Sequence, residues 1–176
     1  IRWTVLLLVA VLVGGYLALN IGANDAANNI STAVGSGALG LSAAILVASI
    51  GELSGAFLAS DPVSARLREG LFQADAFAED MELASVLVSG MLAASLWLHF
   101  ATFVRAPVSA THSVIGGLLG AGIFANGWSI VQWDQIASIA MVWLITPLAA
   151  GLTAAGVLYG IDRSIAHKPN PVGAAR

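Results

Sequence analysis

The sequence predicts an all-α integral membrane protein, a bundle of transmembrane helices. Of its 176 residues, 58% are hydrophobic and only 10% are charged, and the mean hydropathy is +0.87. An ordinary soluble domain carries about 25% charged residues. Long stretches of this chain carry none, as between Arg105 and Asp134 and between Asp134 and Asp162. A soluble fold could not cover its surface with so few charges, so we expect a multi-pass protein embedded in a lipid bilayer.

The composition also excludes several classes of function. The chain has no cysteine, which rules out disulfide scaffolds, zinc thiolate sites and cysteine nucleophiles. A net charge of −3 with no basic patch argues against nucleic acid as a partner. The HExxH, GxSxG and Walker signatures of enzymes are missing. We therefore expect no enzyme, no resident metal and no other cofactor.

Four segments are long and apolar enough to cross the membrane, which takes about 20 residues as a helix. They are Ile1–Leu19, Leu39–Ala59, Leu83–Val104 and Ile136–Ile161. The last contains Thr146-Pro147, where we expect a kink whose freed backbone groups are satisfied by neighbouring side chains.

Two further segments, Gly22–Gly40 and Pro107–Asn126, are too polar at their start for lipid and too apolar for water. Irregular backbone at membrane depth is tolerated where it is buried in protein or lines an aqueous cavity, and such segments often form binding sites. The sequence therefore predicts a broken helix in the first segment and a re-entrant helical hairpin in the second. Small residues would let the arms of this hairpin approach closely. These residues are Gly116, Gly117, Gly120 and Gly122.

The charged residues concentrate in one segment, 60–82, which we expect to be an amphipathic, soluble loop. Within it, Val63, Leu67 and Leu71 recur at helical spacing, typical of a helix at the membrane surface. We predict one transmembrane unit over residues 1–161, with this loop inside it, followed by a polar tail over 162–176.

The densest polar cluster within the apolar sequence consists of Asn24, Asp25, Asn28 and Asn29. Inserting a carboxylate at membrane depth costs about 2.5–3.5 kcal/mol on insertion scales, so such a residue is expected to have an interaction partner or a function. Asp25 and Asn28 would share one helix face, where carboxylate and amide oxygens suit a small cation. The alternative is structural, with the amides satisfying backbone at a helix break and Asp25 capping a half-helix.

A second polar group, Ser109, Thr111 and His112, comes just before a short apolar run. Hydroxyls and free backbone N–H groups at the start of a helix form an anion site, which the helix dipole strengthens. The alternative is plain capping of a packed half-helix.

Two isolated titratable residues lie within predicted spans. Glu52 has three possible roles: proton carrier, cation ligand, or hydrogen-bond partner inside the bundle. We interpret His99 as a packing residue rather than a ligand.

The two polar segments resemble the paired signatures of the inorganic phosphate transporter (PiT) family. GANDAANNISTAVGSGAL (Gly22–Leu39) is similar to the family pattern GANDxANxxGTxVGSGAL, and ASLWLHFATFVRAPVSATHSVIGGLLGAG (Ala94–Gly122) is similar to WLxxATxxxxPVSTTHxxxGxxxG. Glu52-Leu-Ser-Gly-Ala also looks like a family stretch. Ala110 departs from the pattern, because the family usually has a hydroxyl there.

The resemblance implies a secondary transporter that takes up phosphate with Na⁺ or H⁺, built from two inverted repeats with the site between them. By this resemblance, Asn24, Asp25, Asn28, Ser109, Thr111 and His112 bind substrate, and Asp25, Asn28 and Glu52 serve cation or proton coupling. Only one copy of each signature is present, so the chain resembles the first repeat alone. Its partner would be a second inverted repeat in the same chain or a second copy of the chain.

The resemblance leaves several alternatives open. Some relatives carry sulfate, so a sulfate permease is the second hypothesis, and an intramembrane hydrolase or a structural membrane scaffold is the third. Phosphate with Na⁺ or H⁺, transported across a bacterial inner membrane, is the function we expect.

Overall fold

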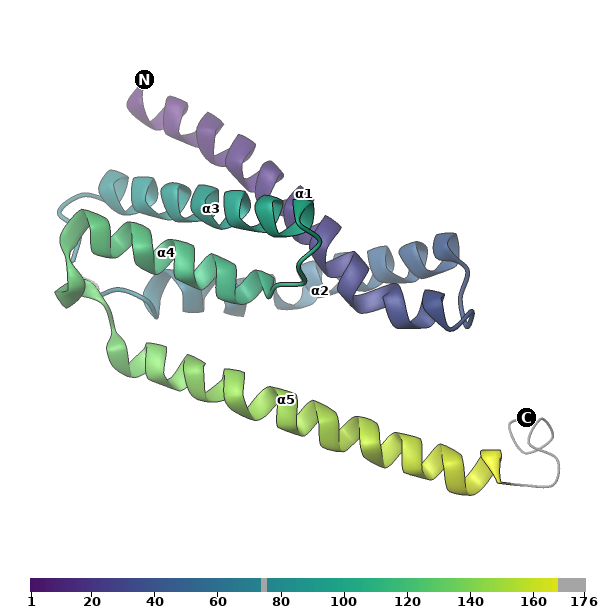
Figure 1. Cartoon of the computed structure of the whole chain (residues 1–176). Coiled ribbons are helices and arrows are strands. Elements are labelled where there is room, and N and C mark those ends of the chain that lie inside the picture. Colours follow the sequence, from purple (N-terminus) through teal and green to yellow (C-terminus); the bar gives the residue numbers. More distant parts are fainter. Residues whose placement is uncertain (74–75, 168–176) are drawn as a thin grey trace. The chain divides into compact units, whose positions relative to one another are not determined.

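The structure is a computed structural model that describes residues 1–73 and 76–167, with the backbone alone for 61–69 and for residue 166. Its elements are helices, and the described residues contain no strand (Figure 1). The helices are α1 (Arg2–Gly35), α2 (Leu41–Glu69), α3 (Asp80–Phe103), α4 (Ala110–Asn126) and α5 (Trp133–Ile161), with a 3₁₀ turn at Trp128–Ile130 and a π-helical turn at Asp162–Ala166. The all-α prediction is confirmed.

Four of these helices are long and apolar enough to cross a membrane, as the sequence predicts. They are α1, the Leu41–Ser60 part of α2, α3, and Trp133–Ile165, which includes α5. Helix α4 has 17 residues, is preceded by an extended link and runs back along α3 (Figure 1). A re-entrant position of this helical hairpin in the membrane stays a prediction.

The broken helix predicted in Gly22–Gly40 is not confirmed, because α1 continues through the polar residues as regular helix and ends at Gly35. Its polar side chains bond along the helix instead of capping an end. The Nδ2 of Asn20 donates to the Tyr16 carbonyl at 2.8 Å, and the Nδ2 of Asn28 donates to the Oδ1 of Asn24 at 3.0 Å. At about 1.5 Å per residue, the 34 residues of α1 extend about 50 Å, well beyond a hydrocarbon core of about 30 Å.

Helices α3 and α4 pack backbone to backbone where two glycines meet. A Cβ on Gly90 would lie 2.7 Å from the Cα of Leu118, and a Cβ on Gly117 would overlap the carbonyl oxygen of Gly90. A Cβ on Gly122 would overlap the ring of Phe72. The predicted close approach of the hairpin arms therefore depends on Gly117 alone among the four glycines, since Gly122 meets Phe72 and both Gly116 and Gly120 face open space.

The start of α4 also packs near α1. Leu17 of α1 forms a buried cluster with Ala94 and Leu98 of α3. Partly buried hydrophobic side chains from three parts of the chain pack against this cluster. They are Ile21, Met91, Val108, Ala110 and Val114. This packing places the α3–α4 link and the first turn of α4 next to the middle of α1.

The segment predicted as a soluble loop is in part a continuation of α2, whose backbone stays helical to Glu69. The chain then pairs with the end of α4 and the turn after it. Phe72 forms an antiparallel bridge with Val131, and the Nδ2 of Asn126 donates to the Ala76 carbonyl at 2.8 Å. The prediction for Ala74 and Asp75 lies outside the described residues.

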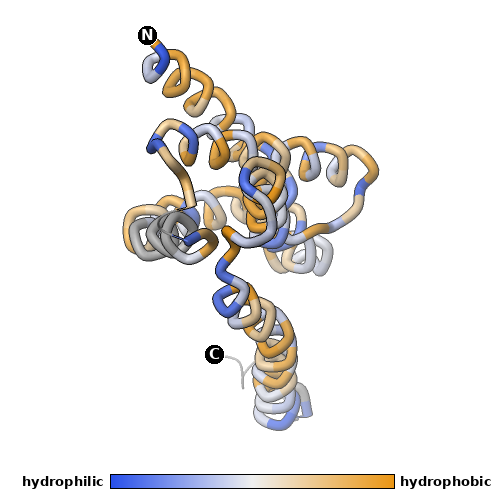
Figure 2. The backbone as a smooth tube through the Cα atoms, turned by 90° about the vertical axis from the view of Figure 1, so that its left-hand side faces the viewer, coloured by the Kyte–Doolittle hydropathy of each residue, from blue (hydrophilic) through white to orange (hydrophobic). Residues whose placement is uncertain are grey.

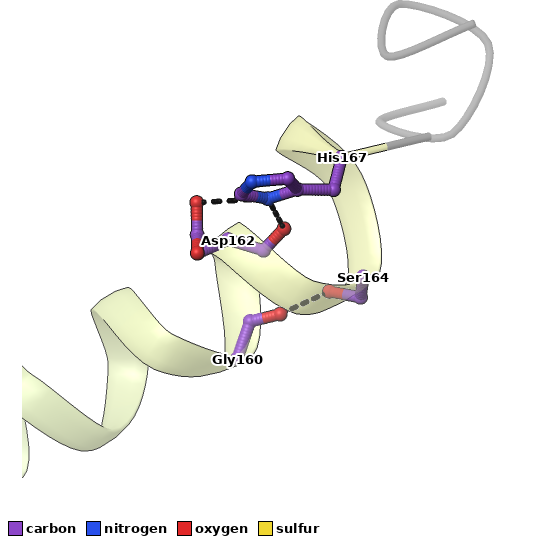
Figure 3. Close-up of polar contacts among 4 residues, drawn as sticks. All are labelled: Gly160, Asp162, Ser164 and His167. Atoms are coloured by element: carbon purple, nitrogen blue, oxygen red, sulfur yellow. Dashed lines mark hydrogen bonds and ion pairs between the residues drawn. The ribbon is translucent and has the colours of Figure 1, made fainter. Parts of the chain in front are cut away.

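Helix α5 forms a separate unit. It continues through Pro147, where the Oγ1 of Thr146 donates to the Val142 carbonyl at 2.8 Å. Hydrophobic residues cover most of its length and hydrophilic ones lie at its ends (Figure 2). In the π-helical turn that follows, His167 lies 3.2 Å from the carboxylate of Asp162, and Ser164 donates to the Gly160 carbonyl (Figure 3). Residues 168–176 of the predicted tail lie outside the described residues.

The substitution Gly117→Ala should separate α3 from α4, because the added methyl group has no room against the Gly90 carbonyl. Overpacking of this kind costs about 1–3 kcal/mol. Thermal unfolding of the detergent-solubilised protein measures the loss. Gly116→Ala is the matched control, since its methyl group meets open space and alanine favours helix by up to about 1 kcal/mol. Equal stability of the two variants would contradict the packing described.

Candidate functional site

The polar residues in the second half of α1 form a hydrogen-bonded chain that reaches α3. Asn24 is 5% exposed, accepts from the Nδ2 of Asn28 through its Oδ1, and directs its own Nδ2 toward the Oγ1 of Thr102 at 3.4 Å. Because 24 and 28 are four positions apart, both side chains lie on one face of the helix. This face meets α3 near the end of that helix.

These residues line a cavity of about 350 Å³, which we call the Arg105 cavity. Arg105 follows the end of α3 and adopts φ 59°, a left-handed conformation that is uncommon outside glycine. Two backbone bonds fix it there: its N–H donates to the Thr102 carbonyl, and the N–H of Ala106 donates to that of Ala101. The full lining is Ala23, Asn24, Ala27, Asn28, Thr102, Arg105, Ala106 and Pro107.

Asp25 faces another side of α1. Successive residues are about 100° apart around a helix, so the Asp25 side chain is turned about 100° from that of Asn24 and about 60° from that of Asn28, onto the neighbouring side of the helix. Its half-buried carboxylate is close enough to Glu52 of α2 for the two charges to interact. Two carboxylates that repel each other in an apolar surrounding are stabilised when a cation binds between them.

The first turn of α4 presents the second polar group. Ser109 caps the helix by accepting from the His112 backbone N–H at 3.3 Å, and its Oγ lies 2.6 Å from the Nδ1 of His112. An imidazole protonated on Nδ1 donates to Ser109 and leaves the serine hydroxyl hydrogen for another acceptor. Capping, the structural alternative for Ser109, is therefore confirmed, and it is compatible with anion binding.

A second cavity of about 350 Å³ lies at this helix start, and we call it the Ser109 cavity. It is lined by Trp97, Val108, Ser109, His112 and Ser113. Thr111 is exposed in the same turn, and its hydroxyl has no hydrogen-bond partner among the described residues. The backbone N–H groups of Ala110 and Thr111 are also unused within the described chain. Three donors at the positive end of a helix dipole can bind an oxyanion.

The structure thus groups the predicted site residues in three places. Asn24 and Asn28 line the Arg105 cavity, Ser109 and His112 line the Ser109 cavity, and the Asp25 carboxylate lies close enough to Glu52 for like-charge repulsion. His99 packs its ring against Tyr16 of α1, with ring centroids 5.9 Å apart. Within the described chain, no group of three or more His, Asp or Glu side chains could hold a metal ion.

Sequence reasoning missed Thr102 and Arg105. Both lie within Ala94–Gly122, but neither belongs to a cluster of polar residues in the sequence. Their positions in the cavity wall depend on where α3 ends and on the left-handed turn that follows. The periodicity of apolar residues in the sequence shows neither feature.

The sequence is similar to proteins described as phosphate transporters or permeases. The sequence model of the phosphate transporter family matches residues 21–176. A Helicobacter pylori protein named "Putative phosphate permease" is 42% identical over 171 residues, which are 97% of this chain and 32% of that protein. The Arabidopsis thaliana protein "Inorganic phosphate transporter 2-1, chloroplastic" is 39% identical over 165 residues, 93% of this chain and 28% of its own length.

A solved structure is similar as well. The chain matches "The sodium-dependent phosphate transporter" with a TM-score of 0.88 and 34% identity, covering 97% of this chain and 42% of that one. The chain therefore spans about a third of the length of the two relatives and about two fifths of this solved protein.

The substitution Ser109→Ala should remove the cap of α4 and lower the free energy of unfolding by about 1 kcal/mol, whereas Ser109→Asn should cost much less, because asparagine caps as well as serine. Chemical or thermal denaturation in detergent measures both variants. If alanine and asparagine behaved alike, Ser109 would not be acting as a helix cap.

Proposed function

The chain belongs to the phosphate transporter family, and we propose that it forms one repeat of a secondary transporter that moves inorganic phosphate across a membrane together with a cation. The observation that carries this proposal is the similarity to a solved phosphate transporter over nearly the whole chain. The family is one of transporters and permeases, so membership also agrees with the prediction that the chain is not an enzyme.

Phosphate is favoured over sulfate by the charges of the chain. At neutral pH phosphate still carries a proton that it can donate, whereas sulfate does not. A carboxylate placed as an acceptor at the anion site would attract phosphate through a hydrogen bond and repel sulfate as an unpaired charge, and Asp25 beside the amide face of α1 is the candidate that the sequence offers. Donors come from the start of α4, where Thr111 and two backbone N–H groups are unused within the described chain.

Na⁺ is the coupling ion that we propose, with Asp25 and Glu52 as its ligands. Two carboxylates on neighbouring helices supply the hard oxygen ligands that a small cation prefers. The name of the solved relative supports Na⁺ over H⁺. Asn28, predicted to serve both substrate and cation, lines the Arg105 cavity, and we assign it to the anion side.

A second inverted repeat would complete the site. The chain covers 42% of the solved relative, a share that fits one repeat of two. In the family arrangement that the sequence resembles, the site lies between the repeats, and the exposed faces of α1 and α4 would meet the partner there. We propose that this partner is another part of the same protein or a second copy of the chain, and that the membrane is a bacterial inner membrane.

The substitution Asp25→Asn should abolish cation-coupled phosphate uptake while the protein stays folded and inserted, because the amide keeps the shape but removes the charge that the cation needs. Uptake by the full-length protein in proteoliposomes measures this. Asp134→Asn is the matched control, since Asp134 lies in the first turn of α5. Uptake by the Asp25 variant at the wild-type rate, with unchanged cation dependence, would remove Asp25 from the mechanism.

The substitution Thr111→Val should weaken phosphate binding by about 1–3 kcal/mol, the cost of one donor lost to a charged group. Ala110→Ser adds a hydroxyl in the same turn on the side that packs against Leu17, Ala94 and Leu98, and it should leave the affinity unchanged. Uptake is measured with sulfate as competitor. Effective competition by sulfate, or an unchanged KM in the valine variant, would show that phosphate is not bound at the start of α4.

A further inference from the structure

The Arg105 cavity has the chemistry of an anion site. Arg105 and Arg2 are the only permanently cationic side chains that the structure describes between residues 1 and 132, and only Arg105 lines a cavity described above. Among the described residues, no carboxylate or other group pairs with its guanidinium. Its backbone is held in a left-handed conformation that costs energy, which fixes the position from which the side chain extends.

The hydrogen-bond chain in the cavity leaves one donor and one acceptor unused. Asn28 donates to Asn24, and Asn24 donates to Thr102. Because the Thr102 oxygen accepts in this chain, its hydroxyl hydrogen can be donated to a ligand. At the other end, the Oδ1 of Asn28 accepts no hydrogen bond from any described residue. The cavity therefore offers a cation, a hydroxyl donor and an amide acceptor.

This set matches a protonated oxyanion better than a metal cation or a fully ionised one. The guanidinium and the Thr102 hydroxyl suit the charged oxygens, since charge-assisted hydrogen bonds are the strong ones. The Asn28 oxygen suits an O–H group of the ligand, which hydrogen phosphate has and sulfate lacks. The Asp25 carboxylate lies on the neighbouring side of α1, close to Glu52 of α2, so cation and anion would bind on adjacent faces of one helix.

The two cavities are also consecutive along the chain. Pro107 lines the Arg105 cavity, and the next residue, Val108, lines the Ser109 cavity. One peptide bond on the α3–α4 link therefore separates the lining of one cavity from that of the other.

We propose that the Arg105 cavity is a first binding position for phosphate, where Arg105 and Thr102 bind its charged oxygens and Asn28 accepts its proton before the anion passes to the Ser109 cavity. This inference rests on the proposed function and adds a residue and a selectivity step to it. A cation at such a position raises the local anion concentration, and salt weakens this effect.

The test compares the full-length wild-type protein with Arg105→Asn, Arg105→Lys and Arg2→Gln. Asparagine tolerates the left-handed backbone but removes the charge, lysine keeps the charge, and Arg2→Gln removes an equal charge from outside the cavity. Two quantities are measured with inorganic phosphate: equilibrium binding in detergent, and uptake into proteoliposomes at low and high ionic strength.

We expect Arg105→Asn to raise the phosphate Kd and KM about tenfold, which corresponds to about 1.4 kcal/mol. The maximal rate should change less, and KM should lose most of its dependence on salt. Arg105→Lys should stay nearer to the wild type, and Arg2→Gln should match it. Sulfate should compete less well in the wild type than in Arg105→Asn combined with Asn28→Leu.

The outcomes separate this inference from the proposed function. Unchanged phosphate binding in Arg105→Asn, or an equal effect of Arg2→Gln, overturns the inference while phosphate transport stands. If the wild-type protein binds phosphate but does not transport it, the proposed function is wrong. The binding affinities of the variants then test the inference without the uptake data. A wild type that binds no phosphate overturns both.

Discussion

The requirement to pair polar groups inside an apolar helix bundle shapes this chain. Amides in a membrane helix are costly unless they find partners, and Asn28, Asn24 and Thr102 satisfy one another in a single chain from α1 to the end of α3. That contact joins the polar half of α1 to the link where α3 ends. The link in turn places Arg105 beside one cavity and the capped start of α4 beside the other. Without the amide chain, the Arg105 cavity would lose most of its polar wall.

Much of the fold follows from the sequence, because the length of an apolar segment directly reflects the thickness of the membrane. The four spans were predictable on that basis, and the cap at Ser109 was an open alternative because a hydroxyl residue precedes a short apolar run there. Composition alone does not show that α1 stays a regular helix to Gly35, with Asn24 and Asn28 bonded to each other along it. The rotation of α4 about its own axis decides which of its glycines contacts α3. In the structure Gly117 contacts α3, whereas Gly116 faces open space. Arg105 could not be found from motifs, because its place depends on the left-handed turn after α3.

The division of charge around α1 gives the proposed mechanism a simple physical basis. Carboxylates on one side suit a cation, and the amide face with Arg105 suits an anion, so each ion lowers the electrostatic cost of binding the other. The tight Gly90–Gly117 contact keeps α4 against α3 and so holds its donors near α1. A partner repeat that covers these faces would shield both ions from water and strengthen their attraction.

The central claim is that phosphate movement is driven by a cation bound beside the anion site. Its most direct test is accumulation of radiolabelled phosphate in proteoliposomes that contain the full-length protein, under an inward Na⁺ gradient and with that gradient dissipated. The account predicts accumulation above the external concentration only while the gradient lasts. Equal phosphate levels inside and outside under both conditions would contradict it.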